Sequence, residues 1–445
     1  MLWIELAVVL AMIVVGARLG GLGLGVMGAL GVALLSFAFG DRPAEPPIDV
    51  MLMIAAVCTA AGALQASGGM DYLVTLAERA LRSHPPAVTF VAPLVAYVFT
   101  LFAGTGHVAY AILPVIAEVS REAGVRPERP LSISVIASQQ AITASPISAA
   151  TVALLGLLSG TGITLSRLLA VCIPSTLVGV MSGAFVASLM GKELKDDPEY
   201  QRRLAAGEIK PPPKQVLEAA DGGAPAGAPW TAKLSVVLFL LGAVVIVLLG
   251  TFPSLRPSYP LNGKVVQMGM PHAIEMVMLS LAAAMVLVCK ADVETVAKGT
   301  VFRAGMQAVI AIFGIAWMGD TFFQANAAQI QGPLEHLVQQ APWTFAFALF
   351  ALSILLYSQA ATVRTLMPVG LSMGLPGAAL VGMFPAVNGY FFIPNYPTVV
   401  AAINFDRTGT TRIGRYVLNH SFMLPGLVAT AVAVISGLAL ARIIL

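Results

Sequence analysis

The stretch that decides the fold is residues 87–118, which read AVTFVAPLVAYVFTLFAGTGHVAYAILPVIAE. This apolar run is too long for one membrane-spanning helix, which needs about 20 residues, and too short for two such helices joined by a turn. The polar sequence GTGH at 104–107 interrupts it near its middle. Non-helical backbone is tolerated at membrane depth only inside the protein or beside a watery cavity. The stretch therefore predicts a re-entrant hairpin whose tip lies inside the membrane.

The rest of the chain has the composition of a membrane protein. Of its 445 residues 58% are apolar and 11% charged, against about a quarter charged in soluble domains. The apolar segments are 2–17, 20–40, 48–67, 87–118, 130–157, 166–191, 231–252, 272–290, 300–324, 343–373, 378–404 and 417–444. They are continuously apolar, which excludes a β-barrel, a soluble enzyme and a nucleic-acid-binding protein. The predicted fold is an all-α polytopic membrane protein, whose first segment lacks the features of a cleaved signal peptide.

Three further segments are interrupted in the same way. YSQAAT breaks 343–373, which predicts a second re-entrant hairpin. TASPIS breaks 130–157 and FIPNYPT breaks 378–404. These two segments predict discontinuous spans with unwound centres.

The chain divides into two similar halves. Residues 192–230 are charged and then rich in proline, glycine and alanine, which indicates a solvated linker between a repeat at 1–191 and a repeat at 231–445. The matching prolines are Pro85 and Pro342, Pro114 and Pro368, Pro146 and Pro397, and Pro174 and Pro425. Each half then holds five crossings and one hairpin. Because five is odd, the second repeat is expected to be inverted relative to the first.

The basic residues predict the orientation. With the N-terminus placed outside, 19 lysines and arginines fall in inside loops and 4 in outside loops, while Arg167 and Arg364 lie within apolar segments. Positive charge is concentrated in cytoplasmic loops of membrane proteins. We expect both termini to be periplasmic and the linker 192–230 to be cytoplasmic.

Inverted repeats with paired broken helices are typical of secondary transporters, whose site lies at the midplane. A helix that begins inside the membrane presents free N–H groups and a positive dipole end, which favour an anion. The candidate substrate-binding residues at the breaks are Thr105, Gly106, Gln139, Gln140, Ser145, Pro146, Ser148, Ser358, Gln359, Thr362, Asn395, Tyr396 and Thr398. None of them is acidic. Tyr396 can equally be a packing aromatic.

Two residues can add charge to this site. Arg364 follows the second hairpin tip, and an arginine inside a membrane segment is costly and usually functional. It can bind a substrate carboxylate with two parallel hydrogen bonds. The alternatives are that its side chain snorkels to the membrane surface or that it pairs with Asp320. His107, at the first tip, can donate to a carboxylate or carry a proton. Its alternative is a neutral ring bonded to backbone.

Several other chemistries have no support in the sequence. No two histidines have ligand spacing, and Cys58, Cys172 and Cys289 are isolated in apolar segments, so no metal site and no cofactor are expected. No nucleotide-binding or hydrolase motif occurs, so we expect no enzymatic activity.

At these same residues the sequence resembles the anaerobic C4-dicarboxylate transporter (Dcu) family. The stretches that carry the resemblance are LQASGGMDYL, AGTGHVAYAILPVIAEVS, RPERPLS, QQAITASPISAATV, IPSTLVG, YSQAAT, PNYPTVVAAINFDRTGTTRIGR and NHSFMLPG. They run over essentially the whole chain. TASPISAA, DDPEYQRRL and LLYSQAAT are more similar to the DcuA branch than to the DcuB branch.

The resemblance implies an inner-membrane exchanger of fumarate, succinate, malate and L-aspartate. It also implies a hairpin-containing transport domain that slides against a scaffold in an elevator mechanism, usually in a homodimer. That superfamily often couples to Na⁺ through Ser-Asn-Thr motifs at the tips, and here the tips read GTGH and SQAAT. A Na⁺- or H⁺-coupled symporter, a channel, and a membrane sensor partner that binds dicarboxylate without moving it are the alternatives.

Overall fold

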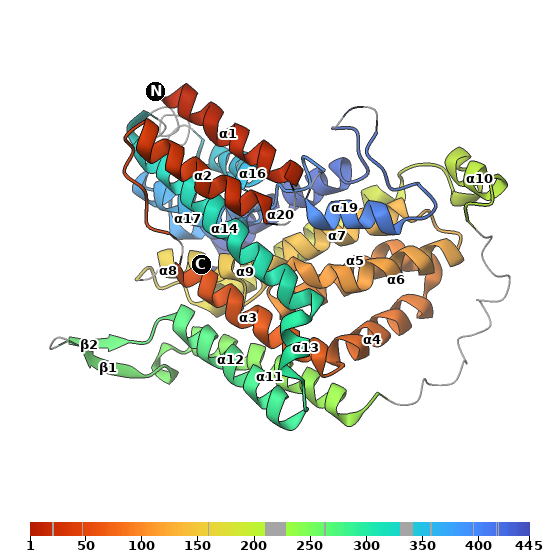
Figure 1. Ribbon diagram of the computed structural model, residues 1–445, viewed down its shortest axis with the longest axis horizontal. Helices are drawn as coiled ribbons and strands as arrows, with labels where there is room; N and C mark the ends of the chain where they lie inside the picture. Colours follow the sequence, from red (N-terminus) through yellow and green to blue (C-terminus); the bar gives the residue numbers. More distant parts are fainter. Residues whose placement is uncertain are drawn as a thin grey trace.

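The chain folds into a bundle of helices (Figure 1). The structure is a computed structural model, and it describes residues 1–19, 22–46, 48–158, 160–209, 228–261, 264–329, 341–356, 358–394, 396–414, 416 and 418–445. The first half contains α1 (Leu2–Leu19), α2 (Gly23–Ala38), α3 (Ile48–Ala66), α4 (Gly69–Ser83), α5 (Val88–Ala103), α6 (Ala109–Glu122), α7 (Glu128–Ala144), α8 (Ala149–Leu157) and α9 (Leu165–Ser188). The second half contains α11 (Trp230–Thr251), α12 (Met270–Val288), α13 (Val293–Lys298), α14 (Thr300–Ala325), α16 (Phe345–Leu356), α17 (Gln359–Ser372), α18 (Gly377–Met383), α19 (Pro397–Phe405) and α20 (Met423–Ile444).

Membrane-length helices dominate the described residues. Seven are long and apolar enough to cross a bilayer, or up to eight if α3 and α4, which meet at a 77° bend, form one broken span. Shorter apolar helices lie at 2–16, 25–38, 342–354 and 377–387. The prediction of an all-α polytopic membrane protein is confirmed.

Helices of the two halves pack against each other in exchanged pairs. Helix α2 contacts α14 while α12 contacts α3, and α17 contacts α8 while α19 contacts α6. Helices α9 and α20 contact each other along their length. In each case a contact between two helices has a matching contact in which the two halves have swapped places. Two similar halves related by a two-fold axis would produce this pattern, and the inversion itself stays a prediction.

Glycines allow the closest of these helix contacts. A Cβ added at Gly179 of α9 would lie 2.3 Å from the Ala429 carbonyl oxygen of α20, and one at Gly183 would lie 2.8 Å from the Pro425 carbonyl oxygen. Close backbone approach through small residues is the usual way in which helices associate within a membrane, where the hydrophobic effect contributes little.

Helix α4 was not expected, because its sequence was assigned to a loop after the span at 48–67. The helix begins after Gly68, whose φ is +79°, and buries Met70, Ala77 and Leu81 on one face. Arg82, near its end, forms ion pairs with Glu78 at 2.8 Å and with Glu122 of α6 at 2.6 Å. A short amphipathic helix is invisible to a search for continuous apolar segments.

The first part of the expected linker is folded and is anchored to one end of the bundle. Residues Pro198–Ala205 form α10, whose first backbone N–H groups donate to Asp197 Oδ1 at 3.0 Å. The other oxygen of Asp197 pairs with Arg126 Nη1 at 2.5 Å, and Arg126 Nε pairs with Glu128 Oε2 at 2.5 Å. The sequence indicated a solvated linker from 192 onward. Most residues of 192–209 are exposed, and the stretch contains a short helix anchored through Asp197, while 210–227 lie outside the described residues.

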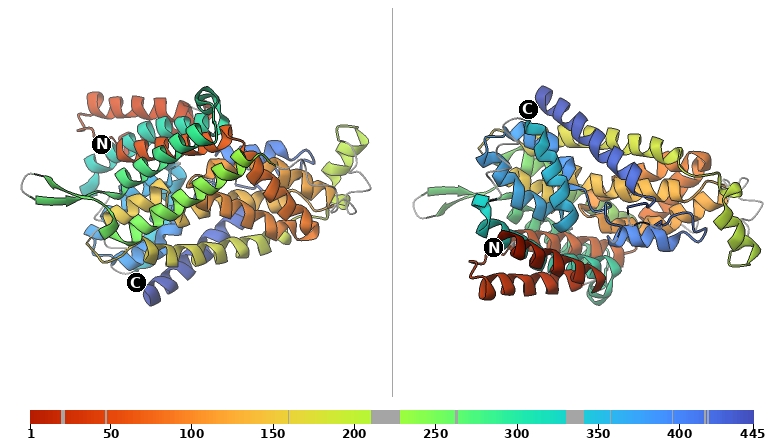
Figure 2. Two further views of the ribbon diagram at one scale, coloured as in Figure 1. Left: turned by 90° about the horizontal axis from the view of Figure 1, so that it is seen from below. Right: turned by 90° about the horizontal axis from the view of Figure 1, so that it is seen from above.

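A two-stranded sheet was also not expected. Strands β1 (Ser258–Leu261) and β2 (Lys264–Gln267) pair antiparallel between α11 and α12. This sheet projects from one end of the molecule and α10 from the opposite end (Figures 1 and 2). Both termini lie toward the end that carries the sheet (Figure 2).

Candidate substrate site

The break in the first broken span lies between α7 and α8. Helix α7 ends at Ala144, and Ser145 is extended, with φ −82° and ψ 128°. Ser148 caps α8: its hydroxyl oxygen accepts from Thr151 N at 3.1 Å and its O–H donates to Ile142 O at 2.6 Å. The hydroxyl of Ser148 is therefore engaged in joining the two half-helices rather than free for a ligand.

The first hairpin tip packs directly on this break. Helix α5 ends at Gly104, whose φ of +68° is a left-handed conformation that favours glycine. A Cβ at Gly104 would lie 2.6 Å from Ile147 Cγ1, and one at Gly106 would lie 3.4 Å from Ile142 Cδ1. Thr105 and Gly106 thus belong to the same region as Ser145 and Pro146. The side chain of His107 lies outside the described residues.

The second hairpin uses the same local structure as the first break. Ser358 caps α17, since its hydroxyl accepts from Ala361 N at 3.1 Å. Thr362 Oγ1 donates to the Ser358 carbonyl oxygen at 2.9 Å. Both side chains stabilise the start of α17, which is the positive end of its dipole.

The second broken span passes through α18, the 3₁₀ turn Phe384–Val387 and α19. Tyr396 precedes α19, and its ring lies 4.9 Å from that of Tyr390, measured between centroids. Asn395 lies outside the described residues. The position of Tyr396 is compatible with a pocket-lining residue and with a packing aromatic, because its ring packs on another aromatic ring beside the break.

A buried hydrogen-bond chain joins the two halves at the breaks. Gln359 Nε2 donates to Asn388 Oδ1 at 3.0 Å, and Asn388 Nδ2 donates to Gln140 Oε1 at 3.2 Å. Gln140 Nε2 in turn donates to Thr430 Oγ1 of α20 at 3.0 Å. Two predicted site residues, Gln140 and Gln359, are thus brought together by Asn388, which the sequence did not single out.

Several buried polar side chains near the breaks have no hydrogen-bond partner within the described part of the chain. They are Gln139, with both amide atoms, Ser145, Tyr390 and Thr398, and each is at most 2% exposed. A buried polar group left unpaired costs about 1–3 kcal/mol, so each such group calls for an explanation. Other unpartnered buried groups, such as those of Ser36 and Thr251, lie away from the breaks.

Arg364 lies on α17, six residues after Ser358, and is half-buried. It forms no ion pair or hydrogen bond with any residue that the structure describes. Asp320 of α14, its predicted alternative partner, instead accepts a hydrogen bond from Thr365 Oγ1 at 2.6 Å. No contact ion pair joins Arg364 to Asp320, although the two charges attract each other over a longer distance.

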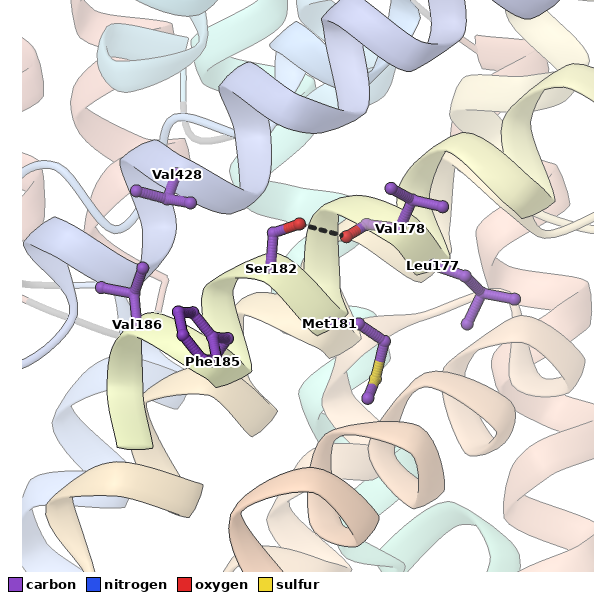
Figure 3. A pocket seen from close by; sticks show the side chains of 7 residues that line it. All are labelled: Leu177, Val178, Met181, Ser182, Phe185, Val186 and Val428. Carbon is purple, nitrogen blue, oxygen red and sulfur yellow. Dashed lines mark hydrogen bonds between the residues drawn. The ribbon is translucent and has the colours of Figure 1, made fainter. Parts of the chain in front are cut away.

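Two hollows in the described part of the protein lie away from these breaks. One is an apolar groove on α9 beside Val428 of α20, where the Ser182 hydroxyl donates to its own helix at Val178 O (Figure 3). The other is a polar cavity between α10 and the loop after α19. No group of three metal-binding side chains occurs among the described residues.

Comparison with known proteins identifies the family. A family model described as the anaerobic C4-dicarboxylate membrane transporter, DcuA_DcuB, matches residues 1–445. The chain belongs to this DcuA/DcuB family. The predicted family membership is confirmed.

DcuA/DcuB proteins similar to this chain cover its full length. The C4-dicarboxylate transporters DcuA of Wolinella succinogenes and of Escherichia coli K12 are 44% and 45% identical to it, over 100% of each chain. The anaerobic C4-dicarboxylate transporter DcuB of E. coli O6:H1 is 40% identical, over 98% of this chain and 97% of its own length. Among solved structures, the Neisseria gonorrhoeae antimetabolite efflux pump MtrF aligns with a TM-score of 0.47 at 13% identity, covering 93% of this chain and 84% of that one.

Proposed function

We propose that this chain is a secondary transporter that exchanges C4-dicarboxylates across the inner membrane by antiport with alternating access. The observation that carries the proposal is the group of buried, unpartnered polar side chains at the breaks, together with Arg364, which lies on α17 after the second break and forms no contact ion pair. Such an arrangement suits a small polyanion, and the family is one of C4-dicarboxylate membrane transporters. Fumarate, succinate, malate and L-aspartate are the proposed substrates.

The proposed site holds the two carboxylates differently. Arg364 binds one of them, because a guanidinium group matches a carboxylate with two parallel hydrogen bonds. Ser145, Thr398 and Gln139 supply neutral donors at the breaks. Ser148, Ser358 and Thr362 contribute by holding the starts of α8 and α17 in place.

Several predicted residues have supporting roles in this proposal. Gly106 and Thr105 let the first tip approach the ligand, while Gln140 and Gln359 hold the two halves together through Asn388. Pro146 keeps the first break unwound, since proline cannot continue the helix. His107, Asn395 and Tyr396 complete the proposed site, as the sequence predicts.

The proposed topology places both termini in the periplasm and the linker in the cytoplasm, as the basic residues predict. The arrangement of the ends supports it, because both termini and the β1–β2 sheet lie opposite α10 (Figure 2). We propose the homodimer that the family resemblance implies.

Uptake is expected to require a counter-substrate. An empty site would return with an uncompensated Arg364 charge, so the loaded return is favoured. Proteoliposomes filled with unlabelled succinate should accumulate labelled aspartate or fumarate many times faster than empty ones, in the absence of ion gradients. Equal initial rates in filled and empty vesicles would contradict exchange, and stimulation by an imposed Na⁺ or pH gradient in empty vesicles would favour a symporter.

The proline- and glycine-rich part of the linker is expected to be dispensable. Deleting about 211–228 should leave folding and exchange near normal, because the deleted stretch contains no apolar run. A deletion extended to residue 194 should instead destabilise the protein, since it removes Asp197 from the buried side chain of Arg126. Thermal unfolding and counterflow of both variants check this, and a stably folded short deletion without exchange would show that the linker takes part in transport.

A further inference from the structure

The polar cavity between α10 and the loop after α19 has a volume of about 650 Å³. Its lining includes Arg203 and Glu208 from the linker side, and Arg407, Thr411 and Arg412 from the loop. It is formed by two segments that are far apart in the sequence. None of the residues assigned to the transport site lines it.

Positively charged side chains outnumber negatively charged ones in the lining of this cavity. Arg407 and Arg412 are exposed and form no ion pair with any residue of the described ranges. Glu208 is paired with Arg202 at 3.0 Å, and Arg203 is paired with Glu199 at 2.7 Å. Glu118 of α6 is paired with Arg121 and attracts Arg407 only from a longer distance. The lining itself carries three arginines against the two carboxylates of Asp406 and Glu208, so its net charge is positive.

Asp406 is a lining residue whose charge is used to shape the loop. Its Oδ1 accepts from Thr408 N at 2.8 Å, and its Oδ2 accepts from Thr410 Oγ1 at 2.8 Å and from Thr411 N at 2.6 Å. The loop is tied further by Arg412 N, which donates to Ser421 Oγ at 3.0 Å. These bonds hold the backbone of the cavity wall in one conformation.

Arg203 lies directly against this loop. Its Nη1 donates to the Arg407 carbonyl oxygen at 2.9 Å. Gly409 has a φ of +76°, and a Cβ there would lie 2.6 Å from Arg203 Cζ. The absence of a side chain at Gly409 thus brings a third guanidinium group to the cavity wall.

The hydroxyl of Thr411 provides a second, independent indication of a ligand. Thr411 is 2% exposed and lines the cavity, and its Oγ1 has no hydrogen-bond partner among the described residues. A buried hydroxyl without a partner is costly. An oxyanion in the cavity would accept a hydrogen bond from this hydroxyl, as it would from the N–H groups of the arginines.

We propose that this cavity is a second anion site, separate from the transport site, that binds a small doubly charged oxyanion such as a phosphate group. Helix α19 has nine residues and separates the break at Tyr396 from the loop, which places the two sites about 13 Å apart along the helix. Arg407 and Arg412 supply the charge, and Thr411 supplies a neutral donor. Because the site joins α10 to the α19–α20 loop, its occupancy ties the start of the linker to the bundle.

Binding of inorganic phosphate to the full-length protein in zwitterionic nanodiscs tests the proposal by isothermal titration calorimetry. The double substitution R407Q/R412Q should weaken phosphate binding about 30-fold or more, and T411V, which keeps the shape but removes the hydroxyl, about tenfold. The matched control K192Q/K195Q removes two exposed positive charges from the same end of the linker, outside the cavity. It should stay within about twofold of wild type.

Equal phosphate affinity of wild type and R407Q/R412Q, or an equal loss in the control, would overturn the proposal. T411V with unchanged affinity would do the same, since the unpartnered hydroxyl would then have no ligand. Saturating succinate should leave phosphate binding intact if the two sites are separate. If succinate displaced phosphate completely, and did so equally in wild type and in R407Q/R412Q, the phosphate would belong to the transport site. Nanodiscs with anionic lipid identify the source of the ligand: competition points to a lipid headgroup, and its absence to a soluble anion.

Discussion

Replacing Arg364 by alanine is expected to weaken succinate binding about 30-fold or more while the protein stays folded. Removing one partner of a buried, hydrogen-bonded charge pair costs about 2–5 kcal/mol of binding free energy, which corresponds to that loss of affinity. Lysine keeps the charge but cannot form two parallel hydrogen bonds. Arg364→Lys should therefore bind less tightly than wild type and more tightly than Arg364→Ala.

The expected stability of the Arg364→Ala variant follows from its surroundings. Arg364 has no ion pair within the ranges that the structure describes, and Asp320 is bonded to Thr365. Truncation at Arg364 thus breaks no contact ion pair, although it removes a longer-range attraction to the half-buried Asp320. A loss of affinity without a loss of stability is the result that distinguishes a ligand-binding arginine from a structural one.

Equilibrium binding of labelled succinate to the purified protein measures this effect, with thermal unfolding measured alongside. Arg167→Ala is the matched control, because Arg167 also lies within an apolar segment but is exposed at the start of α9. If Arg364→Ala folds and binds succinate within about threefold of wild type, Arg364 is not a ligand. Combining it with Asp320→Asn then separates snorkelling from long-range pairing, by whether the two losses add.

The same arginine suggests how an asymmetric substrate is accommodated. The alignment of the halves pairs Tyr110 with Arg364, so only one of two otherwise similar positions carries a charge. One carboxylate is then held more tightly than the other. L-Aspartate, whose two ends differ, should therefore bind in one preferred orientation, whereas the two ends of succinate are equivalent.

The sequence predicted the parts of the fold that depend on local composition. Continuous apolar segments predict spans because hydrocarbon tolerates little else, and the polar interruptions at 104–107 and 143–148 coincide with the ends of α5 and α7. The capping roles of Ser148 and Ser358 could also have been recognised, since serine before a helical segment is a common N-cap. Their hydroxyls were instead assigned to the substrate.

Features that depend on long-range contacts were not predictable in this way. Asn388 is a single amide in an apolar stretch, and its importance is visible only when Gln140 and Gln359 meet it in space. The docking of residues 194–209 depends on Arg126, which looked like an ordinary loop arginine in the sequence. Charge and proline content correctly describe a soluble segment but do not say whether it is fixed to the protein.

Replacing Arg126 by alanine is expected to lower the free energy of unfolding by about 3–5 kcal/mol, because it leaves two buried carboxylates without their partner. The side chain of Arg126 is 4% exposed, and those of Glu128 and Asp197 are 10% and 7% exposed. Ser421 Oγ also donates to Glu128 at 2.6 Å, so the cluster joins the loop before α7, the linker and the start of α20. Loss of Arg126 should release α10 as well as destabilise the bundle.

The loss of stability in Arg126→Ala is expected to depend on pH. Burial alone would raise the pKa of Asp197, but hydrogen bonds from the Tyr200 N–H and from Arg126 outweigh it and hold the pKa below its usual value. A carboxylate with a lowered pKa stabilises the folded protein above its unfolded-state pKa, and this contribution disappears as the pH falls through the folded-state pKa. The stability difference between wild type and Arg126→Ala should thus be constant from about pH 6 to 8 and shrink below about pH 4.

Thermal unfolding in nanodiscs across this pH range measures the difference, and limited proteolysis within 194–209 reports the release of α10. Asp197→Asn is the informative companion, because asparagine still caps α10 while Arg126 keeps Glu128 as its partner. It should therefore cost less than Arg126→Ala, and Arg126→Ala combined with Asp197→Asn should cost less than the sum of the two, since each removes the same ion pair. A stability loss in Arg126→Ala below about 1 kcal/mol, or strict additivity of the two substitutions, would show that the buried cluster does not hold the linker to the bundle.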